Sequence, residues 1–200
     1  MLLELAAWDV PALAATWRAA TPFPHVVIDG MVSAMRLDVL RDAISREPHG
    51  PEHSEIVDCL ASAAKLQHPN LAAFGTALTA PAVLTAVRAI TGKVVSSVEV
   101  RSYCYLAGGY LLPHTDGRHD LRRQIAFAAY LGHDGQCHGG ELELFHCDVD
   151  GAGEIVATEP AVRIEPRANR LVLFDVSDTS LHQIREITMG ARISLAGWFR

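Results

Sequence analysis

The sequence has 200 residues, of which 50% are hydrophobic and 20% are charged, and this composition suits one domain with a sizeable core. The formal net charge is −6, and the chain contains no run of lysine or arginine, so it shows no electrostatic footprint for nucleic acid or for an anionic membrane. We therefore expect a single domain over residues 1–200 that binds neither nucleic acid nor membrane.

The N-terminal segment MLLELAAWDVPALAATWR carries Glu4 and Asp9 where a secretory signal would carry basic residues. We interpret it as a short amphipathic helix of the mature domain. The longest uncharged stretch, residues 66–87, is interrupted by Pro69 and Pro81, which favours packed helices over a membrane span. The cysteines show no C-x-x-C spacing, so we expect reduced thiols in a cytoplasmic protein; they are Cys59, Cys104, Cys137 and Cys147.

Residues 1–92 are predicted to be mainly helical and to support the rest of the domain. Apolar residues recur at helical spacings in the first part of this region, at Val32, Met35, Leu37, Leu40 and Ile44. The segment PFPHVVIDG is the one extended piece. A pair of helices is predicted over 71–79 and 81–91, with Pro81 in a first turn and Gly92 as a C-terminal stop. Residues 48–69 lack a regular pattern, and we interpret them as a mobile or substrate-covering segment.

From residue 93 onward the chain changes to short apolar or alternating runs that are separated by turn residues. The runs are VVSSVEVRSYCYL, RRQIAFAAYLG, GGELELFHC, EIVATE, AVRIEP, RLVLFDV, LHQIREI and ARISLAGWF. About eight short strands in such a region predict an antiparallel sandwich or an open barrel. Residues 93–200 are therefore expected to form the β core of the domain.

Two H-x-D pairs follow apolar strands, and either could place an imidazole and a carboxylate on one face. His146 and Asp148 run into the turn VDGAG, where polar side chains normally face water, so we expect them to lie outside any metal site. His114 and Asp116 are followed by other candidates: a strand ending in Tyr-Leu, the segment Gly139-Gly140, a strand ending in Phe, and His182. We expect the two glycines to allow a bulge or a close approach of strands.

This ordered pattern resembles the Fe(II) and 2-oxoglutarate dependent dioxygenases, most closely their prolyl-hydroxylase-like branch. The resemblance covers roughly residues 98–199, and PFPHVVIDG followed by a helix looks like the usual N-terminal entry of that family. It implies a jelly-roll or double-stranded β-helix core with flanking N-terminal helices. In non-haem Fe(II) oxygenases, two imidazoles and one carboxylate bind the metal and leave its other positions open. His114, Asp116 and His182 would supply these three ligands.

The resemblance also implies a site for the cosubstrate 2-oxoglutarate, with O2 as the second cosubstrate. Arg192 follows His182 by ten residues, and its guanidinium would hold the distal carboxylate of 2-oxoglutarate in a bidentate pair. Ser194 is predicted to share the face of Arg192 and to add a hydroxyl. By resemblance, Tyr130 reaches the same carboxylate and Tyr105 lines the cosubstrate pocket.

The activity implied is hydroxylation of an unactivated C–H bond, with a prolyl residue of a peptide or protein as the first candidate substrate. A free amino acid or a small natural product is the alternative substrate. A zinc-dependent hydrolase uses a similar ligand set, but it would leave Arg192 and the two tyrosines without a role. A non-catalytic jelly-roll binding module would be expected to have lost at least one of the three ligands. The oligomeric state is left open by the sequence.

Overall fold

The structure is a computed structural model, and it describes residues 2–117, 121–132 and 137–200. Its N-terminal part begins with a 3-10 turn over Leu5–Ala7. The elements that follow are α1 (Val10–Ala19), β1 (His25–Asp29), α2 (Ala34–Ser45), β2 (His49–His53), β3 (Val57–Ser62), α3 (Pro69–Leu78) and α4 (Pro81–Thr91).

The predicted helices end where their local sequence dictates. Helix α1 is capped by Asp9, whose carboxylate accepts a hydrogen bond of 3.0 Å from the backbone N–H of Ala12. Helix α4 begins at Pro81 and ends at Gly92, which has a φ of 73° and so adopts the left-handed conformation that glycine tolerates best. The helical pair predicted near 71–79 and 81–91 is therefore confirmed as α3 and α4.

Residues 48–69 lack a regular pattern in the sequence, but most of them form regular secondary structure. Residues 49–62 form the antiparallel hairpin β2–β3, in which His49 pairs with Ser62 and His53 pairs with Asp58. Strand β3 then joins the main sheet beside β4 and β5. Strand β2 is mostly exposed and β3 is buried irregularly, so neither shows the regular alternation of apolar and polar residues that marks a strand with one buried face.

The C-terminal half consists of strands, as predicted. The strands are β4 (Val98–Leu106), β5 (Tyr110–His114), β6 (Ile125–Gly132), β7 (His138–Gly139), β8 (Leu142–Val149), β9 (Ile155–Ile164), β10 (Arg170–Asp175), β11 (His182–Ile184), β12 (Ile187–Met189) and β13 (Ala191–Phe199). The runs EIVATE and AVRIEP are one continuous strand, β9, with Pro160 inside it. Proline is tolerated there because β9 has a neighbouring strand on one side only in the described part of the chain.

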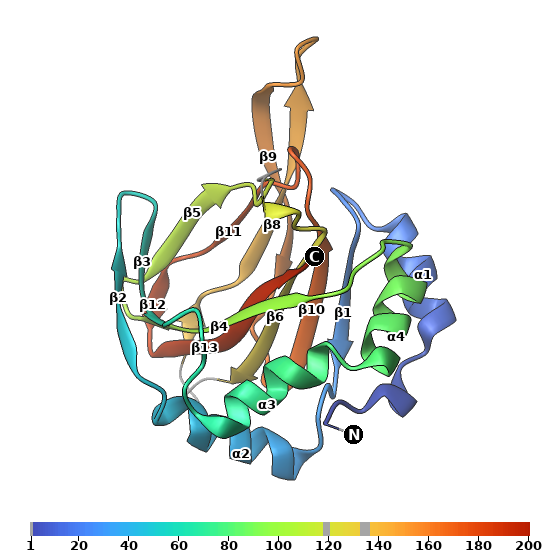
Figure 1. The fold of residues 1–200 in the computed structure, drawn as a ribbon. Coiled ribbons are helices and arrows are strands. Elements are labelled where there is room, and N and C mark those ends of the chain that lie inside the picture. The colour runs from blue at the N-terminus through green and yellow to red at the C-terminus, as the bar shows by residue number, and fades with distance from the viewer. Residues whose placement is uncertain (1, 118–120, 133–136) are drawn as a thin grey trace.

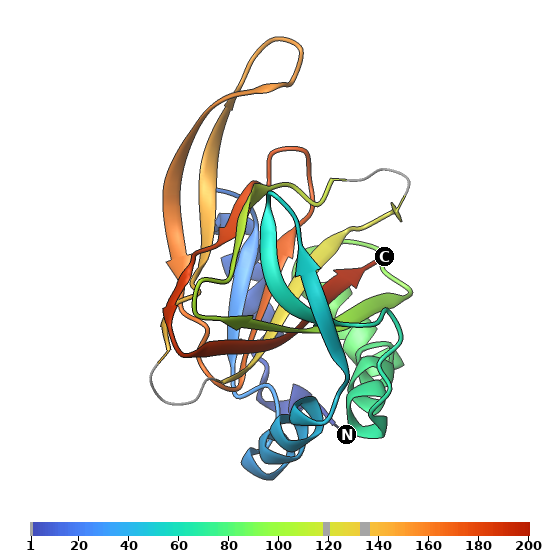
Figure 2. The ribbon, with the colours of Figure 1, turned by 90° about the vertical axis from the view of Figure 1, so that its left-hand side faces the viewer.

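The main sheet has the order β1-β10-β6-β13-β4-β3-β5-β11-β8-β9, and neighbouring strands in the described residues are antiparallel. Figures 1 and 2 show that the sheet curls, so that β5, β11 and β8 face β6, β13 and β4 across an open-ended interior. The helices lie on the outside of the β1-β10-β6-β13-β4 part of the sheet. The predicted mainly β fold with flanking N-terminal helices is confirmed.

Strand β6 shows how the two layers are built. All of IAFAAYLG is buried, because one side of this strand faces the helices and the other faces the interior. Phe127 and Leu131 belong to the core against the helices, together with Phe74 of α3. Ala128 and Tyr130 point to the opposite side, into the interior cluster that includes Phe174. The two-residue period of a strand therefore sorts its side chains between the supporting core and the interior.

Helices α3 and α4 belong to the core of this domain. In the described residues no single helix is long and apolar enough to cross a membrane, although α3 and α4, which are bent by 52° at their junction, pass that test as a pair. Leu71, Phe74, Val83 and Val87 of this pair are each at most 1% exposed and lie in the core beneath the sheet.

Gly139 allows two strands to approach closely, as the sequence predicted. Its φ is +83°, and a Cβ atom at this position would lie 2.0 Å from the backbone oxygen of Glu186. We expect Gly139→Ala to lower the free energy of unfolding by at least about 2 kcal/mol, from overpacking and the left-handed backbone together.

Gly153→Ala provides the matched control, because Gly153 has a φ of +86° but a Cβ there would meet nothing within 4 Å. This control should cost only about 1 kcal/mol, and urea denaturation of both variants measures the difference. Equal losses of stability in the two variants would contradict the close approach at Gly139.

A carboxylate on β8 is held by cations on the outside of the barrel. Glu143 is 1% exposed; it accepts a hydrogen bond of 2.6 Å from Nε of Arg163 and another from Gln183, and it lies 3.3 Å from Arg185. Burial raises the pKa of Glu143, but the bonds from Arg163 and Gln183 outweigh burial, so the net pKa is below its ordinary value.

The lowered pKa of Glu143 gives a pH dependence of stability. The contribution is present above the unfolded pKa of about 4.5 and is lost as the pH falls through the lower folded pKa, because the folded state then has to take up a proton. We expect Glu143→Gln to be less stable than the wild type at pH 7 and to show a smaller loss of stability below pH ~4.5. Thermal unfolding between pH 3 and pH 7 measures this, and parallel pH profiles would contradict it.

Candidate active site

The interior of the curled sheet contains a cavity of about 440 Å³. Its walls come from β4, β6 and β13 on one side and from β5, β8 and β11 on the other, and the tip of the β2–β3 hairpin contributes Ile56 and Val57. All three candidate metal ligands line it, as do Tyr105, Arg192 and Ser194. Side chains predicted from distant parts of the sequence thus meet in one space.

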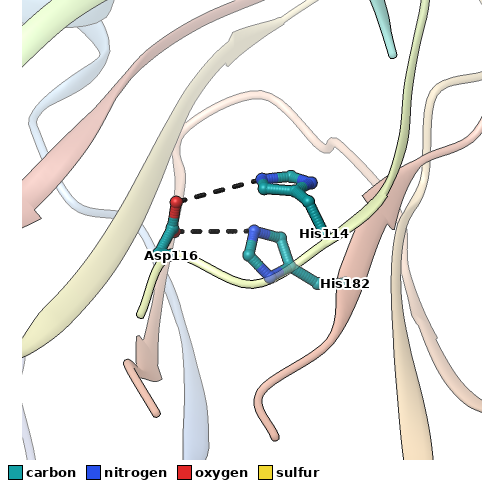
Figure 3. Close-up of side chains that lie close together, drawn as sticks. All are labelled: His114, Asp116 and His182. Carbon is teal, nitrogen blue, oxygen red and sulfur yellow. Dashed lines mark ion pairs between the residues drawn. The ribbon is translucent and has the colours of Figure 1, made fainter. Parts of the chain in front are cut away.

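His114, Asp116 and His182 form a compact cluster at this cavity (Figure 3). The two histidines are brought together by strand pairing, because His182 of β11 lies directly opposite His114 of β5. Nε2 of His114 is 3.9 Å from Oδ1 of Asp116, and Nε2 of His182 is 3.6 Å from Oδ2 of Asp116. Atoms that share a metal at about 2.0–2.3 Å lie at most about 4.6 Å apart, and both distances meet this limit.

Both histidine rings are oriented by the backbone. Nδ1 of His114 lies 3.0 Å from the carbonyl oxygen of Leu112, and Nδ1 of His182 lies 2.9 Å from that of Ser180. When Nδ1 donates its proton to these carbonyls, the Nε2 lone pair of each ring faces the cluster, which is the usual arrangement of a metal-binding histidine. Burial, and then the nearby His114, lower the pKa of His182 to about 4, so its ring is neutral near pH 7.

The second H-x-D pair lies elsewhere. His146 and Asp148 are exposed near the far end of β8 and belong to no group of potential metal ligands in the described residues. The sequence prediction that separated the two pairs agrees with this placement.

Arg192 lines the same cavity and is 3% exposed. It stands on β13 directly opposite Tyr105 of β4, while Ser194 stands opposite Tyr130 of β6. The guanidinium carbon of Arg192 is 5.1 Å from the ring centre of Tyr105 and 4.9 Å from that of Tyr130. Its Nη2 donates a long hydrogen bond of 3.4 Å to the hydroxyl of Tyr130. The structure therefore brings these four residues together.

The group formed by Arg192, Ser194 and the two tyrosines contains buried polar atoms that have no hydrogen-bond partner. Nε and Nη1 of Arg192 and Oγ of Ser194 are buried and have no hydrogen-bond partner. Buried polar groups are normally paired, and a buried cation without an anion is costly. These atoms therefore suit an anionic ligand with several acceptor oxygens, and the two imidazoles and the carboxylate nearby suit a divalent transition metal. The residues present fit both groups that the sequence implies.

Two residues of this cavity were missed by the sequence analysis. Arg123 lies 3.7 Å from Oδ1 of Asp116, and its guanidinium stacks 3.3 Å from the ring centre of Trp198. Trp198 could have been found, because it shares the alternating face of β13 with Arg192 and Ser194. Arg123 lies two residues before Ile125, the first residue of β6, whose side chain faces the helices. Strand alternation would therefore have placed Arg123 on the helix side of the sheet, whereas it lines the cavity.

Comparison with known proteins decides the family. Residues 100–200 match the 2OG-Fe(II) oxygenase superfamily. The chain belongs to this superfamily. The predicted resemblance to the 2-oxoglutarate dependent oxygenases is thereby confirmed. The cofactor is Fe(II), and the cosubstrates are 2-oxoglutarate and O2. The matched residues include all three clustered ligands and the Arg192 group.

Individual relatives are prolyl hydroxylases. An 81-residue stretch is 38% identical to prolyl 3-hydroxylase OGFOD1 of Xenopus laevis; it covers 38% of this chain but only 15% of the length of that relative. The structure is similar to a prolyl-4-hydroxylase of Pseudomonas putida, with 22% identity, a TM-score of 0.68 and coverage of 94% of this chain and 98% of that one.

A prolyl hydroxylase from Trichoplax adhaerens, in complex with a hypoxia inducible factor peptide fragment, has a TM-score of 0.68 at 15% identity, with coverage of 95% and 88%. At these identities the similar structures show the fold, and they confirm the expected double-stranded β-helix class.

Proposed function

We propose that this oxygenase hydroxylates an unactivated C–H bond of a prolyl residue in a peptide or protein. His114, Asp116 and His182 would bind Fe(II), and Arg192 would pair with the distal carboxylate of 2-oxoglutarate. The observation that carries this proposal is the pair of buried, unsatisfied donor atoms on Arg192, which lines the same cavity as the three ligands. A zinc hydrolase would have no use for a buried, unpaired guanidinium at this place.

Each residue has a definite task in this proposal. When bound, iron and 2-oxoglutarate would supply the oxidising chemistry, with release of succinate and CO2. His182 and His114 would offer Nε2 lone pairs, and the Nδ1 contacts of the two rings hold these in place. Arg192 would neutralise and orient the cosubstrate carboxylate, while Ser194 and Tyr130 would complete its hydrogen bonds. Tyr105 would form a wall of the cosubstrate pocket, and its buried ring would exclude water.

The substrate is proposed from the relatives and from the shape of the cavity. The relatives described above are prolyl hydroxylases, and one was solved with a peptide fragment. The β2–β3 hairpin places Glu52, Ile56 and Val57 at the cavity, where they could contact more of a substrate than one side chain. A free amino acid or small natural product is the alternative substrate.

We also propose that residues 1–200 act as one domain, in which residues 1–92 support the catalytic core of residues 93–200. The helices of the first part pack on the outer face of the strands that carry Tyr130 and Arg192, which supports this division. Cys59, Cys104 and Cys147 carry thiols rather than disulfides, which fits a reducing cytoplasm.

An anaerobic titration with Fe(II) and 2-oxoglutarate tests the cofactor assignment. A weak visible charge-transfer band should appear only when both are present. The same protein is then given O2 together with proline-containing peptides or free L-proline, and mass spectrometry locates any added oxygen atom. Hydroxylated peptide with succinate supports the proposal, and hydroxylated free proline supports the alternative. Absence of both the band and succinate would contradict the oxygenase function.

A further inference from the structure

Strands β8 and β9 continue past the body of the protein as a two-stranded ribbon (Figures 1 and 2). Strand pairing fixes its position relative to the site, because His182 of β11 lies opposite Leu144 of β8, and Leu144 lies opposite Val162 of β9. Residues 146–160, which we name the hairpin arm, therefore begin beside the metal cluster and extend beyond it. The five residue-to-residue steps from Leu144 to Val149 span about 17 Å.

The hairpin arm has little packing of its own. Every residue from 146 to 160 is exposed except Cys147 and Ile155, which are partly buried. Val149 is 47% exposed and Val156 is 63% exposed. A two-stranded ribbon with both faces in water is marginally stable alone, so a partner that covers it would be expected to stabilise it.

The hairpin arm also has a free edge. Strand β9 is the last in the order of the main sheet and pairs only with β8 among the described residues. Between Ile155 and Glu159, before Pro160, which has no backbone N–H, the outer edge of this strand presents backbone N–H and C=O groups, and an extended peptide can add to it as a further strand. Strand β9 pairs with β8, and β8 contributes Leu142 to the cavity wall, so the inner end of this edge lies one strand away from the cavity wall.

The negative charge of the hairpin arm indicates which kind of peptide segment would bind to its edge. It contains Asp148, Asp150, Glu154 and Glu159 but no lysine or arginine. Asp150 has a structural task, because its carboxylate accepts hydrogen bonds from the N–H groups of Ala152 and Glu154. Asp148 and Glu159 share one face, since His146 lies opposite Glu159 and Asp148 lies opposite Ala157.

We infer that the hairpin arm is a docking strand for an extended, positively charged segment of the protein substrate. This inference rests on the proposed function and names the class of substrate: a protein whose target residue lies near lysine or arginine in an extended stretch. A second copy of this chain fits the edge less well, because pairing two β9 strands would bring carboxylates of like charge together. A free amino acid would be too small to reach from the cavity to the arm.

Binding of a labelled peptide tests the inference. The probe is a fluorescein-labelled peptide of about 13 residues, with a central proline flanked by alternating valine and lysine. A second peptide has glutamate in place of each lysine. We expect the full chain, loaded with metal and 2-oxoglutarate, to bind the lysine peptide at least about tenfold more tightly in fluorescence anisotropy. Equal affinity for the two peptides would overturn the inference.

Matched variants locate the effect. The triple variant Asp148→Asn, Glu154→Gln and Glu159→Gln should weaken binding of the lysine peptide about tenfold. The control changes the charge equally on other parts of the surface, with Glu4→Gln, Asp38→Asn and Asp42→Asn. All of these residues lie outside the cavity, so both variants should bind 2-oxoglutarate like the wild type. Equal loss in the two triple variants would show a general charge effect and overturn the inference.

Hydrogen exchange then tests the edge itself. The lysine peptide should slow exchange of the backbone amides of residues 155–159 and leave α2 unchanged. If the peptide protects only amides elsewhere in the chain, the docking strand is wrong. It is also wrong if the amides of residues 155–159 become protected without peptide as the protein concentration rises, because a second copy of the chain would then occupy the edge. If wild type binds Fe(II) and 2-oxoglutarate but fails these tests, only the docking strand is wrong. If it binds neither cofactor, the proposed function fails as well.

Discussion

Asp116→Ala should abolish 2-oxoglutarate turnover and most Fe(II) binding. Asp116 is 5% exposed, and it is the one carboxylate in the cluster of potential ligands among the described residues. Its loss would leave two imidazoles and no anionic ligand for a divalent cation. Removal of groups that merely orient metal ligands typically costs about 10- to 100-fold in metal affinity, so loss of this ligand should cost more than about 100-fold. Anaerobic Fe(II) titration and CO2 release from labelled 2-oxoglutarate measure the two effects.

The control for Asp116 is His146→Ala. His146 belongs to the same H-x-D pattern but is exposed on the hairpin arm, so its Fe(II) affinity and its basal 2-oxoglutarate turnover should equal those of the wild type. Because Asp116 also lies 3.7 Å from Arg123, thermal unfolding of the metal-free proteins should be compared as well. If Asp116→Ala and His146→Ala bind Fe(II) equally well, the metal assignment is wrong.

Arg192→Ala should weaken binding of 2-oxoglutarate by about 2–5 kcal/mol, because the distal carboxylate would lose its cation in a buried place. This corresponds to roughly a thirtyfold to several-thousandfold loss of affinity, at about 1.4 kcal/mol per tenfold. Iron binding should survive, since Arg192 is not among the clustered ligands. Anaerobic calorimetry with Fe(II) and then with 2-oxoglutarate separates the two events.

Arg192→Lys should recover part of the lost affinity. Lysine restores the positive charge but not the two-pronged geometry of the guanidinium. It also lacks the planar group that lies over the rings of Tyr105 and Tyr130, so part of the pocket would stay unfilled. The expected order of affinity is therefore wild type, then Arg192→Lys, then Arg192→Ala. The same 2-oxoglutarate affinity in wild type and Arg192→Ala, or none in either, would contradict the cosubstrate site.

Much of this arrangement was available from the sequence by itself. Pro81 and Gly92 determined the ends of α4 through backbone conformations that belong to those residues. The two-residue period of β13 placed Arg192 and Ser194 on one face, and the order of motifs selected His114, Asp116 and His182 over the second H-x-D pair. These are local or ordered features, and they depend on residue type and spacing alone.

Only the tertiary structure decided which distant segments meet. The pairing of β11 with β5 puts His182 opposite His114, and the pairing of β13 with β4 and β6 brings the tyrosines to Arg192. The β2–β3 hairpin and the contact of Arg123 with Asp116 had no readable sequence signal. Strand register and neighbours are set by packing between residues far apart in the chain, so local propensity cannot specify them.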